Sequence, residues 1–229
     1  MQLLLRQVMG GLVAVARGLP LAQYAKQPER TDAADGSPPA PRIKITGAVA
    51  RAKRAVSAAS KPIADRVQRH SQSEFKRLGI NLRKEEPKLG KLIEAWRADN
   101  VERVTSLLEF ERDELADILS KGEGKTVPEL RLRIAERLDV SRAKADLLAR
   151  DQVLTLNAQI SKERQVAAGV TSYYWSTSND ERVRESHEAI DGERFDWDDP
   201  PDVDGEPAHP GEPVNCRCIA APILPELDD

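Results

Sequence analysis

The chain has 229 residues, of which 40% are hydrophobic, 32% charged and 4% aromatic, and it contains two cysteines. This length supports one ordinary domain and a smaller one. The low aromatic content leaves aliphatic packing to form the core, and a chain rich in Ala, Leu, Arg and Glu favours helices. Two cysteines exclude a disulfide-stapled secreted scaffold, which indicates synthesis inside the cell. No uninterrupted apolar run approaches the roughly 20 residues of a membrane span, so we expect no membrane partner.

The net charge of −3 conceals a strong asymmetry along the chain. Residues 1–100 carry 19 basic and 9 acidic side chains, whereas residues 170–229 carry 4 and 16. A basic N-terminal half is suited to phosphate or to an acidic protein surface, and the acidic C-terminal part repels DNA unless a cation is bound there. The charges are also consistent with solvated faces of ordinary helices, because Lys and Arg commonly cover protein surfaces.

Residues 1–47 are predicted as an N-terminal helix followed by a proline-rich linker. Arg6 and Arg17 interrupt the apolar run of residues 1–19, which favours an amphipathic docking helix over an export signal. Residues 27–43 hold several prolines without an apolar period and are predicted to be extended.

Residues 48–139 are predicted as a helical region. Pro62 is expected to separate two basic helices, because proline fits the first turn of a helix better than its interior. Apolar residues then recur at three- and four-residue steps, which predicts one long amphipathic helix or two joined near Asn100. The expected helices are residues 47–60, 63–79, 88–121 and 129–138.

Residues 140–224 are predicted as a compact mixed domain, followed by an acidic tail over residues 225–229. Ser141 is the expected N-cap of a long helix that ends at Gly169. β-Branched and aromatic residues favour strands over residues 170–175 and 216–221, with proline-rich loop between them. The sequence therefore predicts an α+β fold in which a long helical N-terminal region precedes a small mixed domain.

Both cysteines and two of the three histidines fall within one 32-residue stretch, as His187, His209, Cys216 and Cys218. On a strand, residues i and i+2 project from the same face, so the two sulfurs are expected to lie together. Two thiolates and two imidazoles would complete a tetrahedral zinc site, although one residue between the cysteines departs from the usual spacing of two to four. The sequence predicts zinc or another divalent metal on some subset of these residues.

Two other interpretations account for the same residues. Cys216 and Cys218 are also typical of small half-buried strand residues, because free cysteine is among the most buried residue types. Asp180, His187 and Asp191 also suit a catalytic site that orients a water or a phosphate. The sequence contains no Walker A loop, H-E-x-x-H motif or dinucleotide fingerprint, which removes support from most large enzyme classes.

Several short motifs follow one another in a fixed order. They are A-R-D-Q from Ala149, Asn157, Arg164, Gly169, Y-W-S-T-S-N-D-E-R-V-R-E-S-H from Tyr174, I-D-G from Ile190 and P-G-E-P-V-N-C-R-C from Pro210. In this order and spacing the chain resembles the phage Mu F-like minor head protein family over about residues 75–222. Within the motifs we expect Trp175 in a core, Arg182 and Arg184 in a polar network with His187, and a structural role for Asn215.

The resemblance implies a minor head protein of a tailed phage or prophage, without catalytic activity. Such a protein is made in the bacterial cytoplasm and joins the portal protein, with scaffold and major capsid proteins, during procapsid assembly. It then lies in the virion, inside the head near the portal, where some members contact packaged DNA and assist its ejection. The family's proposed ion-binding positions correspond to Asp180, His187, Asp191 and Cys216, with Cys218 beside them.

The basic helical arm is expected to contact double-stranded DNA without reading its sequence, because the duplex exposes one phosphate charge per about 1.7 Å. The candidate contacts are Arg51, Lys53, Arg54, Arg66, Arg69, Lys76 and Arg77. Two alternative functions remain: a metal-dependent hydrolase or toxin-like enzyme built on the C-terminal domain, and a cytoplasmic DNA-binding protein with no virion role.

Overall fold

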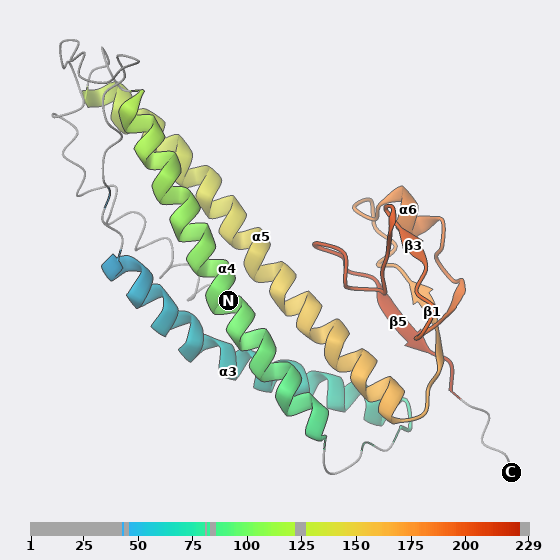
Figure 1. Ribbon diagram of the computed structural model, residues 1–229. Helices are drawn as coiled ribbons and strands as arrows, with labels where there is room; N and C mark the ends of the chain where they lie inside the picture. The colour runs from blue at the N-terminus through green and yellow to red at the C-terminus, as the bar shows by residue number, and fades with distance from the viewer. Residues whose placement is uncertain (1–42, 44–45, 81, 83–85, 122–126, 225–229) are drawn as a thin grey trace, which may run out of the picture. The chain divides into compact units, whose positions relative to one another are not determined.

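The computed structural model describes residue 43, residues 46–80, residue 82, residues 86–121 and residues 127–224. Within these residues, three long helices precede the strands: α3 (Thr46–Arg77), α4 (Pro87–Ser120) and α5 (Val127–Ala167) (Figure 1). No helix among the described residues combines the length and apolarity that a membrane span requires. The predicted docking helix, the linker apart from residue 43, and the acidic tail lie outside the described residues.

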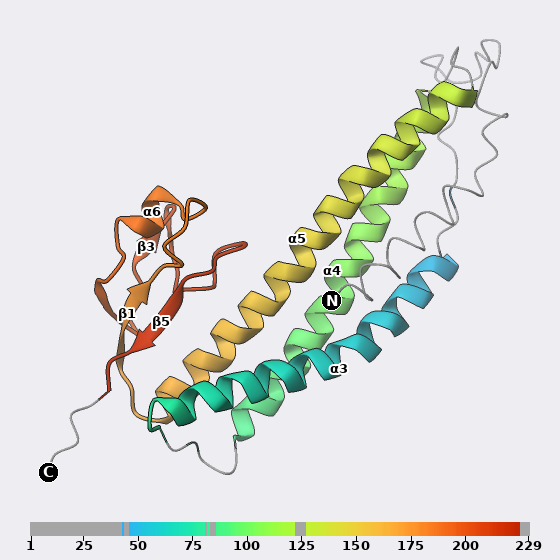
Figure 2. The same ribbon diagram turned by 180° about the vertical axis from the view of Figure 1, so that it is seen from behind.

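A small antiparallel sheet follows the helices, so the predicted α+β fold is confirmed. Its strand order is β2-β1-β5, with β1 in the centre. Strands β1 and β5 lie side by side in Figure 2. A separate hairpin, β3 and β4, turns through Asp204 and Gly205, whose positive φ values of 59° and 88° suit an Asp-Gly hairpin turn. The elements after α5 are β1 (Ser172–Ser176), α6 (Glu185–Glu188), β2 (Arg194–Asp196), β3 (Asp202–Val203), β4 (Glu206–Pro207) and β5 (Ile219–Pro222).

Two predicted helix boundaries are wrong. α3 continues through Pro62, and buried apolar residues on both sides of it, such as Val56 and Ala64, favour an unbroken helix over the local preference of proline. α5 likewise runs past Ser141, whose buried hydroxyl donates to the Glu111 carboxylate at 2.6 Å and lies 2.9 Å from the carbonyl oxygen of the preceding turn. Tertiary contacts therefore override the capping preference of serine.

The chain divides into two compact units. The first comprises α3 up to Ser60 and residues Ala98–Ala149. This unit contains a buried carboxylate, since Glu111 on α4 is only 1% exposed. Glu111 accepts two hydrogen bonds from the guanidinium of Arg137 on α5, at 2.7 and 2.8 Å. The second unit comprises Lys61–Arg97 and the chain from Arg150 onward.

The second unit has two cores. One joins its helices through Leu89, Trp96, Leu156 and Ile160. The other lies against the inner face of the sheet and consists of Tyr173, Trp175, Val203, Cys216 and Cys218, with Phe195 and Trp197 packed on it. The expectation that Trp175 belongs to a core is confirmed, since its side chain is 0% exposed.

One stripe of α5 holds the loop that precedes β5. Asp151, Ala158 and Gln165 are seven residues apart, which places them on the same helix face. The Asp151 carboxylate accepts from the backbone N–H of Asn215 at 2.6 Å, and the Gln165 amide donates to the carbonyl of Ala220 at 2.9 Å. Helix α5 therefore fixes both ends of the segment that carries the cysteines.

Gly211 packs closely against α5. It has a φ of 84°, and a Cβ added there would lie 2.5 Å from the Cβ of Ala158. Gly205 has a similar φ of 88° but nothing within 4 Å of such a Cβ, so it isolates the effect of backbone conformation. We expect Gly211→Ala to lower the free energy of unfolding by about 1–3 kcal/mol more than Gly205→Ala, through steric overpacking. Denaturant titration measures the difference.

Ala158→Gly removes the atom that the new Cβ meets, although it costs about 0.5–1 kcal/mol by itself in a helix interior. Relative to Ala158→Gly alone, adding Gly211→Ala is therefore expected to cost no more than Gly205→Ala costs in the unchanged chain. Equal destabilisation by Gly211→Ala and Gly205→Ala, with no recovery in the double variant, would show that the loop does not lie this close to α5.

Candidate metal centre

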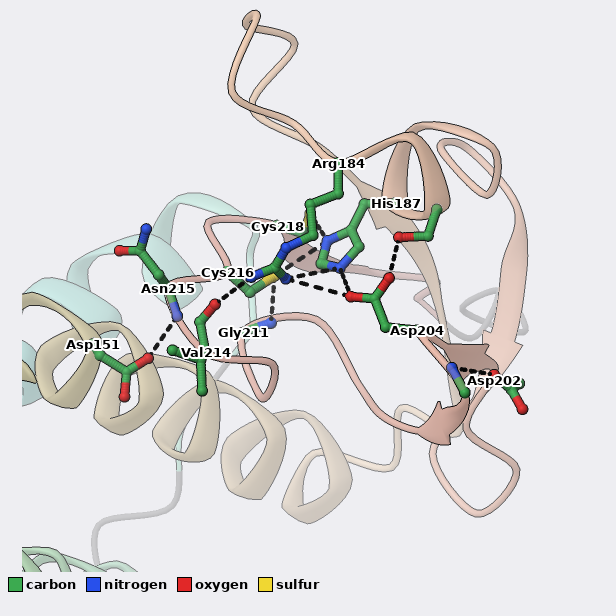
Figure 3. Close-up of polar contacts among 12 residues, drawn as sticks. Asp151, Arg184, His187, Asp202, Asp204, Gly211, Val214, Asn215, Cys216 and Cys218 are labelled. Carbon is green, nitrogen blue, oxygen red and sulfur yellow. Dashed lines mark hydrogen bonds and ion pairs between the residues drawn. The ribbon is translucent and has the colours of Figure 1, made fainter. Parts of the chain in front are cut away.

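The candidate site is a buried cluster of one imidazole and two thiols in the second unit (Figure 3). His187 lies on α6, and Cys216 and Cys218 lie in the loop before β5. Nδ1 of His187 is 3.3 Å from Sγ of Cys218 and 3.6 Å from Sγ of Cys216. The three side chains are 2%, 4% and 7% exposed, so water contributes little to their solvation.

A turn brings the two sulfurs to the histidine. Val214 and Asn215 form this turn, and Asn215 adopts a left-handed φ of 58° that asparagine tolerates better than most residues. Strand β5 begins only at Ile219, so the prediction that the cysteines lie on a strand is wrong. The sulfurs nevertheless lie together, as expected, because loop geometry replaces strand alternation.

The two thiols share a proton unequally. The S–H of Cys218 donates to the sulfur of Cys216, which lowers the pKa of Cys216 to about 6 despite its burial. The backbone N–H of Gly211, 3.4 Å from the same sulfur, further stabilises the thiolate. The hydrogen bond to Cys216 and burial raise the pKa of Cys218 well above its usual range. One sulfur is therefore ready to bind a cation at neutral pH, and the other has to release its proton.

The far side of the His187 ring faces charged groups. Nε2 lies 3.3 Å from a guanidinium nitrogen of Arg184 and 3.7 Å from a carboxylate oxygen of Asp204. Ser186 donates to Asp204 at 2.6 Å, and Arg184 also donates to the carbonyl of Val214 at 2.6 Å. The predicted polar network of Arg184 and His187 is thus present.

This environment suits either tautomer of the ring. With the proton on Nδ1, the ring donates toward the sulfurs and Nε2 accepts from Arg184. If His187 held a cation through Nδ1, its proton would be on Nε2, the nitrogen that the Asp204 carboxylate faces at 3.7 Å, and this carboxylate would help to orient the ring. Two sulfurs and one imidazole nitrogen also match the preference of Zn²⁺, so the donor set fits this metal.

The acidic residues proposed as ligands have other partners. Asp180 forms a two-pronged ion pair with Arg217 and also accepts from the backbone N–H of Arg182 at 3.0 Å. The Arg217 hydrogen bond is the main reason that the pKa of Asp180 falls to about 2. Asp191 accepts from the backbone N–H of Thr177 at 2.8 Å. These carboxylates brace the loops around the cluster, and the exposed Arg182 contributes through its backbone.

His209 also lies apart from the cluster. It is 4% exposed, and its Nδ1 is 2.7 Å from the hydroxyl of Tyr173. Of the six predicted ligand residues, the structure thus brings together His187, Cys216 and Cys218. Asp204 was not among the predicted residues, because nothing in the spacing of an Asp-Gly turn indicates that its carboxylate faces a histidine 17 positions earlier.

Burial makes His209 a source of pH-dependent stability. Desolvation lowers its pKa, the nearby Lys162 lowers it further, and Glu212 opposes both. Because the folded state disfavours protonation, this contribution is complete above the unfolded pKa of about 6.5 and is lost as the pH falls below it. Between pH 7.5 and 5.5 we expect thermal stability to fall less in His209→Gln than in the unchanged chain. Equal losses in the two proteins would contradict a buried neutral imidazole.

The seven candidate DNA contacts all lie on α3, and all are exposed. Arg51, Lys53 and Arg54 belong to the first unit, and Arg66, Arg69, Lys76 and Arg77 belong to the second. Helix α3 carries eight lysines and arginines and two acidic residues. The excess of basic residues in the N-terminal half of the sequence thus includes a group of exposed cations on this one helix.

Comparison with known proteins adds the family. Residues 112–221 match the family model described as Phage Mu protein F like protein. This part of the chain is therefore similar to the phage Mu F-like family. The Mu F-like region contains the thiol–imidazole cluster and all of α5 from Val127 onward, so the resemblance seen in the sequence is confirmed. The family suggests a role in phage head morphogenesis, which is structural rather than enzymatic.

One relative extends the match toward the N-terminus. A Haemophilus influenzae protein described as uncharacterized is 33% identical over 141 residues, which cover 60% of this chain and 31% of that protein. The chain thus spans about a third of the length of this relative. No solved structure matches the chain significantly.

Proposed function

We propose that the chain is a minor head component of a tailed phage or prophage, incorporated with the portal protein during procapsid assembly. The observation that carries this proposal is the Mu F-like match over residues 112–221. Residence in the virion, inside the head near the portal, follows from the same proposal. Contacts with scaffold and major capsid proteins belong to the assembly stage in the host cytoplasm.

The decisive experiment locates the chain in assembly products. Procapsids and mature heads are purified on gradients from cells in which the encoding phage or prophage is induced, and the chain is measured by mass spectrometry. We expect it in both particles, and a pull-down of the co-expressed portal protein is expected to retain it. Its absence from procapsids and heads would overturn the assignment. If the portal protein still retained the chain in the pull-down, the chain would bind the portal without becoming part of the particle.

We further propose that His187, Cys216 and Cys218 hold a divalent cation, most suitably Zn²⁺. When bound, the metal would cross-link α6 to the loop before β5 and so stabilise the Mu F-like fold. Gly211 and Asp204 would support the ligands from either side, through the N–H bonded to Cys216 and the carboxylate facing His187. A structural role suits the family better than the alternative of a hydrolase or toxin-like enzyme.

Helix α3 is proposed to contact packaged DNA through its exposed cations. Binding should weaken as salt rises, because each neutralised phosphate releases counterions. We expect Arg66→Gln with Arg69→Gln to reduce the slope of log affinity against log salt by about 2, since each lost phosphate contact removes about one. Fluorescence anisotropy with duplexes of unrelated sequence measures this slope.

The matched control is Arg131→Gln with Arg133→Gln, which removes two exposed arginines from α5. This variant is expected to keep the original slope. An unchanged slope in the α3 variant, or equal slopes in both variants, would contradict a DNA contact on α3.

A further inference from the structure

The thiol–imidazole cluster offers three protein ligands, whereas a closed structural zinc site has four. Among the described residues, no other histidine, cysteine, aspartate or glutamate places a ligand atom within 4.8 Å of all three. Asp180 and Asp191 are held by Arg217 and by the backbone N–H of Thr177. Among the described residues, no fourth histidine, cysteine or carboxylate therefore completes a tetrahedral site.

Both cysteines line a groove with a volume of about 490 Å³ in the second unit. Its walls come from the end of α3, the C-terminal third of α5 and strand β5, with apolar contributions from Phe75, Leu154 and Ile219. His187 is not part of this wall, and its Nε2 faces Arg184 and Asp204 instead. The groove therefore borders the loop that carries both cysteines.

The groove carries more basic than acidic side chains. Arg77 and Arg217 line it, against one described acidic residue, Glu74. Arg217 also compensates Asp180, which leaves Arg77 as an exposed cation at the end of α3. Positive charge along a cleft raises the local concentration of anions.

Resting on the proposed metal centre, we infer that a cation on His187, Cys216 and Cys218 keeps one coordination position open toward this groove, where it takes an exogenous anionic donor such as a carboxylate. The site then differs from a closed structural zinc site, in which all four ligands come from the chain. It provides a point at which an acidic side chain of an assembly partner bonds to the metal directly.

Cobalt substitution tests the open position by spectroscopy. The reduced full-length chain is loaded with Co²⁺, whose visible bands report coordination and whose sulfur-to-cobalt charge-transfer band reports the thiolates. Titration with azide, and separately with acetate, is expected to shift the visible bands in a saturable way with one ligand per cobalt. The charge-transfer band should persist, which shows that Cys216 and Cys218 remain bound.

Two variants locate the ligand. Ile219→Trp narrows the groove at an exposed position and is expected to reduce the azide-induced shift without loss of the charge-transfer band. His70→Ala should leave the cobalt spectrum and its response to azide unchanged. A spectrum that azide does not alter, or one that changes in His70→Ala before azide is added, would show that the chain fills the fourth position and would overturn the inference. Failure to bind cobalt at all would remove the metal centre as well, while the head-assembly proposal is tested independently by particle composition.

Discussion

Replacing His187 with alanine is expected to abolish the stabilisation of the chain by zinc. The imidazole supplies one of three donors, and the remaining pair of sulfurs cannot hold the cation against its hydration with similar affinity. With free zinc at a thousand times its dissociation constant, binding to the folded state alone adds about 4 kcal/mol to stability. That increment should appear in the unchanged chain and be absent from the variant.

Differential scanning calorimetry with and without zinc, under reducing conditions, measures the increment. Comparing each protein with its own metal-free form separates metal binding from the cavity that His187→Ala also creates. His70→Ala is the control, because this exposed histidine pairs with Glu74 outside the cluster and should leave the increment intact. A full zinc-dependent increment in His187→Ala would exclude the proposed ligand set. Asp204→Asn, which keeps the fold of the hairpin turn, is expected to reduce zinc affinity about 10- to 100-fold.

The sequence allowed the type and order of the elements to be predicted where periodicity was strong. The long helical region, strand β1 and the burial of Trp175 follow from apolar spacing and from β-branched and aromatic composition. Helix boundaries were less predictable, because Pro62 and Ser141 carry local preferences that burial on both sides and a hydrogen bond to Glu111 override. These contacts join residues distant in sequence, so no local pattern reports them.

The candidate site was predictable by residue type but not by geometry. Ligand-type side chains in one stretch pointed to His187, Cys216 and Cys218 together with three residues that the structure assigns to other partners. These three residues are bonded to other groups in the loops and strands around the cluster. Asp180 pairs with Arg217, Asp191 accepts from the backbone N–H of Thr177, and His209 is hydrogen-bonded to Tyr173. Carboxylates and imidazoles serve equally well as turn anchors and as ligands, and only the fold distinguishes these uses.

Helix α5 connects the fold to the site. Its stripe of Asp151, Ala158 and Gln165 holds the cysteine loop, and its end carries Arg164, which joins the same helix to α3 and to the start of α4. The family match includes this helix together with the cluster. The motif residues Arg164 and Asn215, far from each other in sequence, therefore serve one purpose, which is to fix α5 and the loop in a single unit.

Arg164→Ala is expected to lower the free energy of unfolding of the second unit by about 1.5–3 kcal/mol, because it removes hydrogen bonds between charged groups and leaves the partly exposed Glu86 carboxylate to water. Arg164 is 3% exposed, and its guanidinium donates to the two oxygens of Glu86 at 2.7 and 2.9 Å. It also donates to the carbonyl of Gln68 at 3.1 Å, so the change breaks contacts to two other segments at once. Denaturant titration followed by tryptophan fluorescence suits this measurement, since Trp96 and Trp175 both lie in this unit.

Two comparisons give this prediction its meaning. Lys88 on α4 is an exposed ion-pair partner of Glu163, which precedes Arg164 on α5, at 3.7 Å. Lys88→Ala should change the free energy of unfolding by less than about 1 kcal/mol. Replacing both members of the buried pair, as Arg164→Met with Glu86→Gln, should lose less than Arg164→Ala alone, because no uncompensated charge remains. If Arg164→Ala were as mild as Lys88→Ala, the guanidinium would have to be solvated in solution. The connection of α5 to α3 and α4 would then depend mainly on the apolar contacts around Leu156 and Ile160 and on the hydrogen bond from Trp96 to the carbonyl of Gln152.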